Sequence, residues 1–293
     1  MDPRKSRQEA GIAAMALCAF CWSLAGIFIK AIDWQPFAIA CGRSLVAAVF
    51  IFAVLKGKPK FDFSRLQILT ALSYAATMLL FIFANKHTTS ANAILLQYGA
   101  PIYVAFMSAA LLKEPPKGED WFALCGICIG MVLFFLDSLG KGNLVGDIAA
   151  VGSGVAFAAN IMLLRRQKDA RPLDSLLLGH LLTAAIALAI SLFMPAPAFS
   201  VRAVSAILGL GVIQIGMAAV LLSFAVKRIT ALQSVLIAVI EPLCNPLWVF
   251  LATGEAPGAR SLAGGAVILA SVFASSVISV RRAERPAAKT AKA

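Results

Sequence analysis

The chain has 293 residues, of which 60% are hydrophobic and only 14% charged, and its mean hydropathy is +0.87. A soluble domain carries a charge on about a quarter of its residues, so this composition excludes a water-soluble protein. The net charge of +12 does not indicate a nucleic-acid partner, because the basic residues lie in links and tails between apolar segments.

Apolar segments of about 20 residues follow one another along the chain, and short polar links separate them. A helix of that length spans the bilayer core of roughly 30 Å, and backbone groups in lipid have to be satisfied internally. The sequence therefore predicts an all-α integral membrane protein with ten transmembrane helices. The expected ranges are 10–31, 36–55, 66–84, 91–112, 120–138, 144–163, 173–194, 202–224, 231–252 and 261–280.

The basic residues before the first apolar segment raise the alternative of a signal peptide. The segment from Ala10 to Ile29 is long, contains Trp22, and has a counterpart in the second half of the chain. We therefore assign it to the first transmembrane helix.

A stretch of sequence from the first half recurs in the second half at a constant offset of 141 residues. The offset is kept through two prolines and a glutamate, which indicates a duplication of about half the chain. We expect a first repeat over residues 1–140 and a second over 141–293, each with five transmembrane helices. The matched pairs include Lys86 and Lys227, Thr89 and Thr230, Pro101 and Pro242, Glu114 and Glu255, and Pro116 and Pro257.

The basic residues predict the orientation, because cytoplasmic links carry an excess of Lys and Arg. If the N-terminus is cytoplasmic, 20 Lys and Arg residues fall on that side, five fall on the other, and Arg43 lies within a span. Both termini are therefore expected in the cytoplasm. An odd number of spans in each repeat then makes the two repeats inverted relative to each other, an architecture typical of transporters that alternate their access between the two sides.

The six cysteines do not form a disulfide framework. Cys18 and Cys21 are three residues apart in the first segment, and Cys125 and Cys128 repeat that spacing in the fifth. A zinc site would need a second Cys or His pair, so we expect these residues to pack as small apolar groups. No metal and no cofactor are expected.

Several short motifs resemble those of the ten-helix drug/metabolite transporter superfamily of the EamA type. Lys113 departs from the family pattern, because glycine precedes the equivalent glutamate in the second copy. The chain is most similar to the bacterial YddG-type exporters of aromatic amino acids. The motifs are Trp22-Ser23, Arg43, the run from Gly146 to Ala150, Arg165-Arg166, Glu241-Pro242 and Gly254-Glu255.

This resemblance implies a secondary transporter of the bacterial inner membrane. It implies export of aromatic and other neutral amino acids, or of similar small amphipathic metabolites. A multidrug-type metabolite exporter of the same superfamily and a passive facilitator or channel are the alternatives. A carrier shows accelerated exchange in counterflow, whereas an open pore does not.

Glu241 is the carboxylate expected at membrane depth. It follows Arg228 by 13 residues, which places it roughly 20 Å along the helix. Asn245 and Trp248 share its helical face. Two roles remain open: a structural bond to helix ends beside Pro242, which frees a carbonyl, or handling of substrate or protons.

Four residues are candidates for a gating or structural role: Arg43, His180, Pro101 and Pro242. We expect Arg43 to face the bundle and to pair with helix-end carbonyls or a carboxylate. A lone histidine in an apolar helix is more often a buried core residue, and that is the first interpretation for His180.

The other candidates for substrate binding are neutral. A phosphate-bearing substrate would need several intramembrane cations, whereas amides, hydroxyls and aromatic rings suit a zwitterion with an apolar side chain. Some of these residues are expected only to hold helices together. They are Trp22, Ser23, Tyr74, Thr77, Asn92, Gln97, Tyr98, Tyr103, Asn160 and Gln214.

The motifs of intramembrane enzymes, such as His-Glu-x-x-His or Gly-x-Ser-x-Gly, do not occur in the sequence. We therefore expect no enzyme, and a scaffold has no need of an inverted duplication. The expected partners are the lipid bilayer, a small-molecule substrate such as an amino acid, and, as an open alternative, protons. The sequence is compatible with a monomer but does not determine the oligomeric state.

Overall fold

The structure of the protein is a computed structural model, and it describes residues 3–29, 32–88, 90–136, 143–253 and 258–290. The description does not extend to the side chain of Asn245 or to those of residues 283–290. The candidate Asn245 and the duplicated residues Thr89, Glu255 and Pro257 therefore lie outside the described set.

The described residues form helices and short links, as the sequence predicts. In chain order the helices are α1 (Pro3–Ser23), α2 (Ala25–Ile29), α3 (Pro36–Val54), α4 (Arg65–His87), α5 (Ser90–Gln97), α6 (Ala100–Leu112), α7 (Gly118–Phe135), α8 (Leu144–Arg166), α9 (Pro172–Ser191), α10 (Val201–Gly209), the π-helix η1 (Leu210–Met217), α11 (Ala218–Ala225), α12 (Ala231–Ala238), α13 (Ile240–Thr253) and α14 (Ala259–Thr290).

Nine helices within the described ranges are long and apolar enough to cross a membrane. A shorter apolar helix, Ala231–Cys244, occupies the position of the ninth predicted span. The predicted all-α membrane fold is thereby confirmed. Several spans that the sequence predicts as continuous are divided, and the fourth and the ninth are divided at matching places.

Both divided spans resume with a proline in the first turn. Pro101 is the second residue of α6, and Pro242 is the third residue of α13. Proline has no N–H to donate and a fixed φ, so it suits a helix start and interrupts a continuing helix. Tyr98 and Gly99 lie between α5 and α6, and Val239 lies between α12 and α13.

The first helix of each repeat packs against a link in the other repeat. A Cβ atom added at Gly11 of α1 would lie 2.6 Å from Cβ of Arg228, between α11 and α12. A Cβ atom added at Gly146 of α8 would lie 2.7 Å from the backbone of His87, at the end of α4. An offset of 135 residues relates the two glycines, and 141 relates the two contacted residues.

A pair of hydrogen bonds repeats this reciprocity. The Cys18 thiol of α1 donates to the carbonyl of Ala218 on α11 at 3.3 Å. The Ser153 hydroxyl of α8 donates to the carbonyl of Thr77 on α4 at 2.9 Å. The same two offsets exchange these contacts, as two inverted repeats require. The repeat boundary near residue 140 itself stays a prediction.

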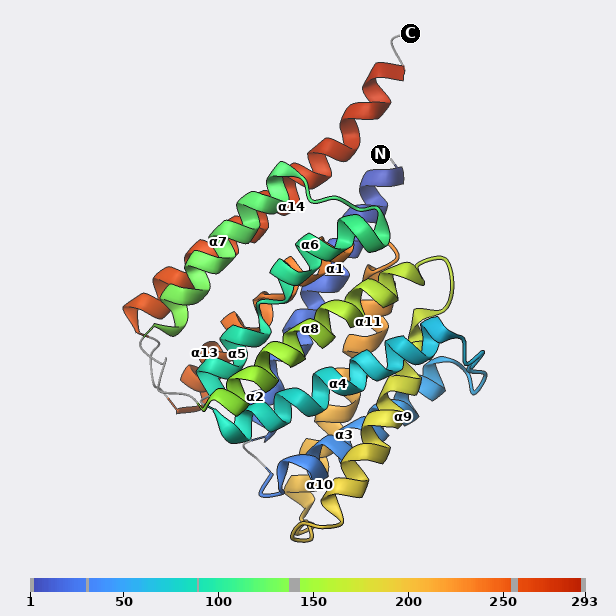
Figure 1. Ribbon diagram of the computed structural model, residues 1–293, viewed down its shortest axis with the longest axis vertical. Coiled ribbons are helices and arrows are strands. Elements are labelled where there is room, and N and C mark those ends of the chain that lie inside the picture. Colours follow the sequence, from blue (N-terminus) through green and yellow to red (C-terminus); the bar gives the residue numbers. More distant parts are fainter. Residues whose placement is uncertain (1–2, 30–31, 89, 137–142, 254–257, 291–293) are drawn as a thin grey trace.

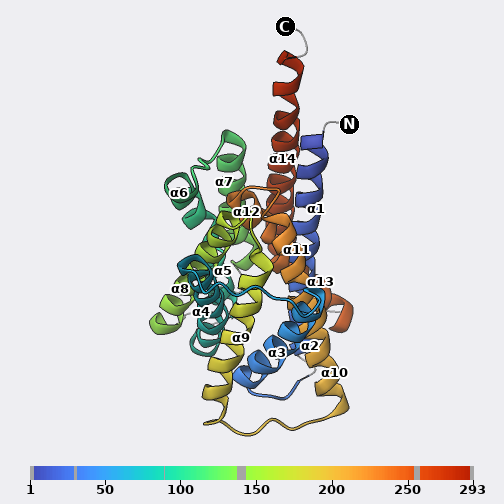
Figure 2. The same ribbon diagram turned by 90° about the vertical axis from the view of Figure 1, so that its right-hand side faces the viewer.

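The first and last helices have their outer ends on the same side of the molecule. Figures 1 and 2 show the start of α1 beside α14, which extends further in the same direction. Arg171 donates to the carbonyl of Lys58 at 3.2 Å, and Lys227 donates to the carbonyl of Ala170 at 2.8 Å. These contacts join three of the links that carry the excess of basic residues.

Helices α7 and α14 pack side by side along their length (Figure 1). Small residues allow this contact, because a Cβ atom at Gly264 would lie 2.5 Å from the carbonyl oxygen of Gly130. Gly126 faces Ser271 of α14 in the same way. The glycine pair of the fifth predicted span therefore serves helix packing.

Candidate functional site

Five polar side chains from five segments form what we call the central polar cluster: Arg43, Tyr74, Tyr98, His180 and Glu241. Arg43 belongs to α3, Tyr74 to α4 and His180 to α9. Tyr74 and Tyr98 belong to one buried core, and Met78, which the Arg43 guanidinium contacts, packs against the same core. The structure thus brings together both ionic candidates that the sequence places at membrane depth.

The breaks of the two repeats meet inside this cluster. The Tyr98 hydroxyl, between α5 and α6, donates a hydrogen bond of 2.5 Å to Oε2 of Glu241 in the first turn of α13. The same hydroxyl lies 3.5 Å from the carbonyl oxygen of Ala238, at the end of α12. Each repeat therefore contributes a broken helix to the same point.

Tyr74 and His180 form a buried pair between α4 and α9. The Tyr74 hydroxyl lies 3.2 Å from Nε2 of His180, and the ring centroids are 4.6 Å apart. His180 is completely buried, and Gly179 leaves space beside the Tyr74 ring. His180 thus has the buried and hydrogen-bonded position that the first interpretation expects.

Arg43 is partly buried, and few described groups contact its guanidinium. Its Nη2 lies 3.6 Å from Sδ of Met78, a weak acceptor. Its Nε is buried and has no hydrogen-bond partner among the described residues. A buried donor without a partner is unfavourable. Because Nε has no described partner, Arg43 can still donate a hydrogen bond to a ligand.

Gln214 is the candidate on the π-helix η1. Its side-chain amide donates to the carbonyl of Trp22 at 3.3 Å, and its Oε1 is buried without a partner in the described part of the chain. π-Helical turns occur frequently at functional sites, because they shift side chains out of the regular α-helical register. The sequence pattern predicts a regular α-helix over 202–224, and the structure differs from that prediction by the π-helix within it.

The tryptophan candidates join α1 to two other helices. The Trp248 indole donates to Oγ of Ser23 at 2.9 Å, and the Ser23 hydroxyl donates to the carbonyl of Phe20 at 2.6 Å. The Trp22 ring meets Phe157 edge to face. These contacts place two aromatic candidates, Trp22 and Trp248, beside Ser23 on α1 and its neighbouring helices.

Other neutral candidates make contacts between helices α4, α5 and α8. The Gln97 amide donates to Oγ of Ser153 at 2.8 Å. Asn160 is buried and donates to the carbonyl of Thr70 at 3.0 Å. The Thr77 hydroxyl bonds within its own helix to Ser73. These polar groups are engaged between helices, so their substrate-binding role stays a prediction.

The remaining candidates lie on α5 and α6. Tyr103 is partly buried and packs against the main apolar core, and Asn92 is partly buried on α5. Pro101 begins α6, as described above. None of these three makes a described contact with the central polar cluster.

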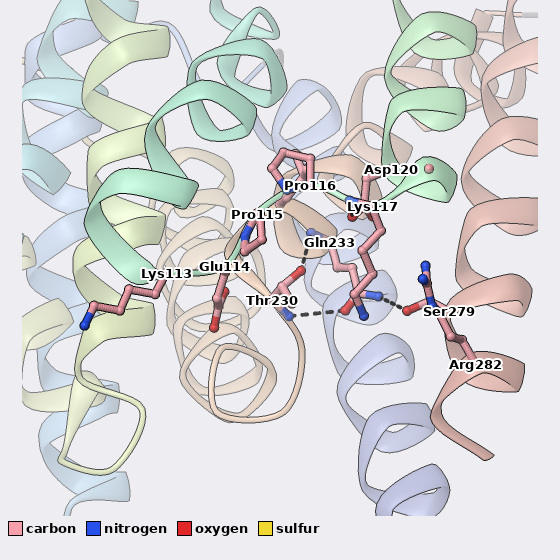
Figure 3. Close-up of a pocket in the computed structure, with 12 residues that line it drawn as sticks. Lys113, Glu114, Pro115, Pro116, Lys117, Asp120, Thr230, Gln233, Ser279 and Arg282 are labelled. Carbon is pink, nitrogen blue, oxygen red and sulfur yellow. Dashed lines mark hydrogen bonds between the residues drawn. The ribbon is translucent and has the colours of Figure 1, made fainter. Parts of the chain in front are cut away.

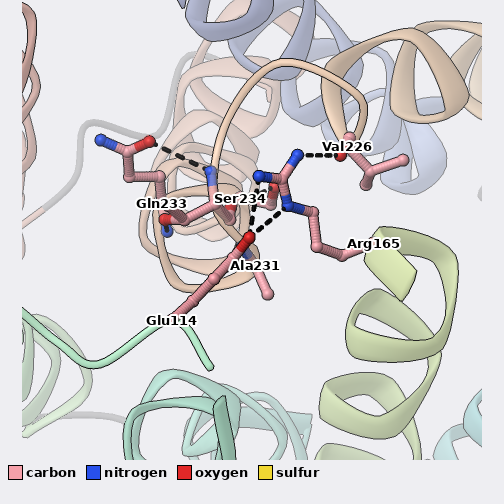
Figure 4. Close-up of polar contacts among 7 residues, drawn as sticks. Glu114, Arg165, Val226, Ala231, Gln233 and Ser234 are labelled. Atoms are coloured by element: carbon pink, nitrogen blue, oxygen red, sulfur yellow. Dashed lines mark hydrogen bonds and ion pairs between the residues drawn. The ribbon is translucent and has the colours of Figure 1, made fainter. Parts of the chain in front are cut away.

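A second polar site, on the side where the chain ends lie, was not among the predicted site residues. Glu114 forms an ion pair of 2.8 Å with Arg165, and it also accepts the backbone N–H of Ala231 at 3.3 Å (Figure 4). Arg165 in turn donates to the carbonyl of Val226 at 2.7 Å. Glu114 belongs to the duplicated motif, and Arg165 to a predicted family motif, so both were visible as separate signals.

A pocket of about 500 Å³ lies beside this ion pair. The α6–α7 link, the start of α12 and the end of α14 line it (Figure 3). Its charged residues have both signs, and Gln233 bonds to Thr230 and to Ser279. The pocket is therefore separate from the central polar cluster, which lies at the helix breaks.

An all-helical membrane protein with two inverted repeats around a buried polar cluster is the architecture of a secondary transporter. Comparison with known families supports this class. The model of the EamA-like transporter family matches the chain twice, over residues 9–136 and 144–277. The chain therefore belongs to the EamA-like transporter family.

Similar proteins agree with this assignment. An uncharacterized transporter of Archaeoglobus fulgidus is 28% identical over 269 residues, which cover 90% of this chain and 95% of the relative. A solved crystal structure superposes with a TM-score of 0.81 and covers 94% of this chain and 99% of its own. That structure is 18% identical, so it shows the fold.

Proposed function

We propose that this EamA-family transporter exports neutral amino acids, or similar small amphipathic metabolites, across the inner membrane of a bacterium by alternating access. Both termini face the cytoplasm in this proposal. The hydrogen bond between Tyr98 and Glu241 is the observation that carries it. Because it joins the breaks of two inverted helices, it marks the place where such transporters hold their substrate.

The chemistry of the cluster supports a substrate without net charge. Arg43 is its cation and Glu241 its carboxylate, and the other members are two tyrosines and a histidine. A phosphorylated metabolite would meet a single arginine opposed by a carboxylate, which is a poor match for two negative charges. Aromatic rings and hydroxyls beside Trp22 and Trp248 suit an apolar side chain.

Counterflow in proteoliposomes tests the proposal. Vesicles loaded with unlabelled phenylalanine are expected to accumulate external labelled phenylalanine transiently, whereas unloaded vesicles are not. Protein-free vesicles are the control. Equal uptake by loaded and unloaded vesicles would indicate a passive facilitator, and no uptake in either would contradict transport of this substrate.

An efflux panel extends the test to the substrate class. Cells that lack their own exporters and express this protein are expected to tolerate a load of Phe, Tyr, Trp, Met or Thr better than control cells. Protection against paraquat-like cations alone would favour the multidrug-type exporter instead.

A further inference from the structure

The ion pair of Glu114 and Arg165 joins the two matched regions of the chain on the side where the outer ends of α1 and α14 lie (Figure 4). Oε1 of Glu114 accepts from Nε and Nη2 of Arg165, both at 2.8 Å. Oε2 accepts the backbone N–H of Ala231, the first residue of α12. Arg165 also donates to the carbonyl of Val226. Glu114 belongs to the first matched region, and its partners and Val226 belong to the second.

This group is well shielded from water. The side chains of Arg165 and Glu114 are only 12% and 19% exposed. Solvent screens such a pair weakly, and hydrogen bonds between ionised groups are the stronger class. The carboxylate also lies at the N-terminus of α12, where the helix dipole favours a negative charge. The contact therefore stabilises the present arrangement of its helices, and that stabilisation is lost in any conformation that separates them.

The ion pair lies at one end of two half-helices whose other ends meet at Tyr98. Helix α6 begins just after Tyr98, and the backbone N–H of Glu114 bonds to the carbonyl of Ser108 near its end, at 3.3 Å. Helix α12 runs from Ala231 to Ala238, whose carbonyl oxygen lies 3.5 Å from the Tyr98 hydroxyl. Helices α6 and α12 also pack against each other. They are therefore joined at both ends.

The equivalent half-helix of the other repeat is in a different environment. The offset of 141 residues relates α5 to α12 with identical bounds. All eight residues of α12 are buried. The described side chains of α5 from Asn92 to Gln97 are partly exposed, apart from that of Ala93. Two copies in the same conformation would bury equivalent helices equally, so the two repeats differ in conformation, and the side that holds α12 is the more tightly packed.

We propose that Glu114 and Arg165 form a latch that keeps the transporter closed on this side. A substrate that passes there has to separate α6 from α12, and the ion pair has to break when they separate. This inference rests on the proposed function and deepens it, because it assigns the contact that is made in one state of alternating access and broken in the other.

A buried thiol on α6 reports on this separation. Ser108 is completely buried, and its hydroxyl has no hydrogen-bond partner in the described part of the chain. Ser108→Cys therefore introduces a thiol of similar size without removing a described side-chain bond. A bulky, water-soluble maleimide reaches this thiol only when α6 moves away from its neighbours.

The labelling rate is measured in the purified full-length protein, with the unsubstituted protein as the background from the native cysteines. Adding Glu114→Gln to Ser108→Cys is expected to raise the rate roughly tenfold or more, because the lost charge-assisted bonds are worth at least that factor. Labelling follows the population of the open state when opening is fast. Arg165→Lys keeps the charge but loses the fork, so it is expected to give a smaller rise.

Two controls separate a latch from a general loosening of the fold. Glu119→Gln breaks the ion pair with Arg282, which joins α7 to α14 on the same side, and it is expected to leave the labelling of Ser108→Cys unchanged. Ser275→Cys places a second reporter at a buried position of α14. Its labelling rate is expected to stay the same in every variant.

The outcomes decide between the alternatives. If Glu114→Gln does not fold, Arg165→Lys alone supplies the test. An unchanged rate at Ser108→Cys in the folded latch variants would overturn the inference, and so would an equal rise at Ser275→Cys. The labelling assay needs no substrate. Failure of phenylalanine counterflow would therefore refute the proposed function without altering this readout, and unchanged labelling beside active counterflow would refute only the latch.

Discussion

At the scale of single residues, the contact between Tyr98 and Glu241 has a measurable consequence for transport. Glu241→Gln is expected to lower the rate of phenylalanine counterflow, and Tyr98→Phe to lower it less. A hydrogen bond to a charged group contributes about 1.5–3 kcal/mol. Because Tyr98 acts through Glu241, the double variant is expected to resemble Glu241→Gln alone, within about 0.5 kcal/mol of apparent activation free energy.

The control for this cycle is Ser205→Ala, since the Ser205 hydroxyl is exposed and bonds within its own helix, to the carbonyl of Arg202. The rate of this variant is expected to match that of the wild type. Independent, additive losses for Tyr98→Phe and Glu241→Gln would contradict the expectation that Tyr98 acts through Glu241. Unchanged uptake by Glu241→Gln across a pH series would in addition exclude a role for Glu241 in proton coupling.

Lys113 offers a second test at this scale. It ends α6 with φ of 56°, in the left-handed region that side chains with a Cβ atom disfavour. The equivalent residue of the second repeat is a glycine in the sequence. Lys113→Gly is therefore expected to raise the free energy of unfolding by about 0.5–1 kcal/mol, measured by thermal unfolding in detergent. Lys113→Ala, which also removes the charge but keeps Cβ, is expected to give no such gain.

At the scale of helices, the close packing of α7 against α14 depends on glycine. A Cβ atom at Gly264 would lie 2.5 Å from the Gly130 carbonyl oxygen and 2.6 Å from the Phe134 nitrogen, and backbone atoms cannot rotate away. Gly264→Ala is expected to lower the free energy of unfolding by about 1–3 kcal/mol. Gly118→Ala is the matched control, because nothing lies within 4 Å of a Cβ atom there. Equal stability of the two variants would contradict tight packing between α7 and α14.

The helices themselves were largely predictable, whereas their breaks were not. Apolar length determines a transmembrane span, so nine described helices lie where the sequence placed them. Length does not show whether a span is continuous: Tyr98 and Val239 end helices inside predicted spans, although Pro101 and Pro242 were visible signals. The π-helix η1, which carries Gln214, was not predicted, because the apolar pattern of this span indicates only a regular helix.

The candidate site was predictable as a set of residue types but not as an arrangement. Membrane depth identified Glu241 and Arg43, and the structure places Glu241 against Tyr98 and Arg43 against Met78. Hydrogen bonds between distant segments decide the rest, and no sequence spacing predicts that Tyr98 meets Glu241 or that Asn160 meets Thr70. The ion pair of Glu114 and Arg165 was missed for the same reason.

At the scale of the whole molecule, inversion of the repeats links the fold to the proposed function. The contact of Cys18 with Ala218 and that of Ser153 with Thr77 are exchanged by the repeat relationship. A conformation that one repeat adopts toward one side is therefore available to the other repeat toward the opposite side. The two helix breaks meet at the hydrogen bond between Tyr98 and Glu241, so a conformational change of either repeat acts on the same point.

The orientation of this assembly in the membrane follows from its basic residues and is open to direct measurement. The side that holds the start of α1 and the end of α14 is expected in the cytoplasm, because 20 of the 26 Lys and Arg residues belong to it. A membrane-impermeant maleimide is expected to label Lys86→Cys in intact cells but not Ser6→Cys or Arg281→Cys. Permeabilised cells are expected to label all three, and unmodified protein gives the background from the native cysteines. Labelling of Ser6→Cys in intact cells would reverse the orientation, and labelling of only one of the two terminal variants would contradict an even number of spans.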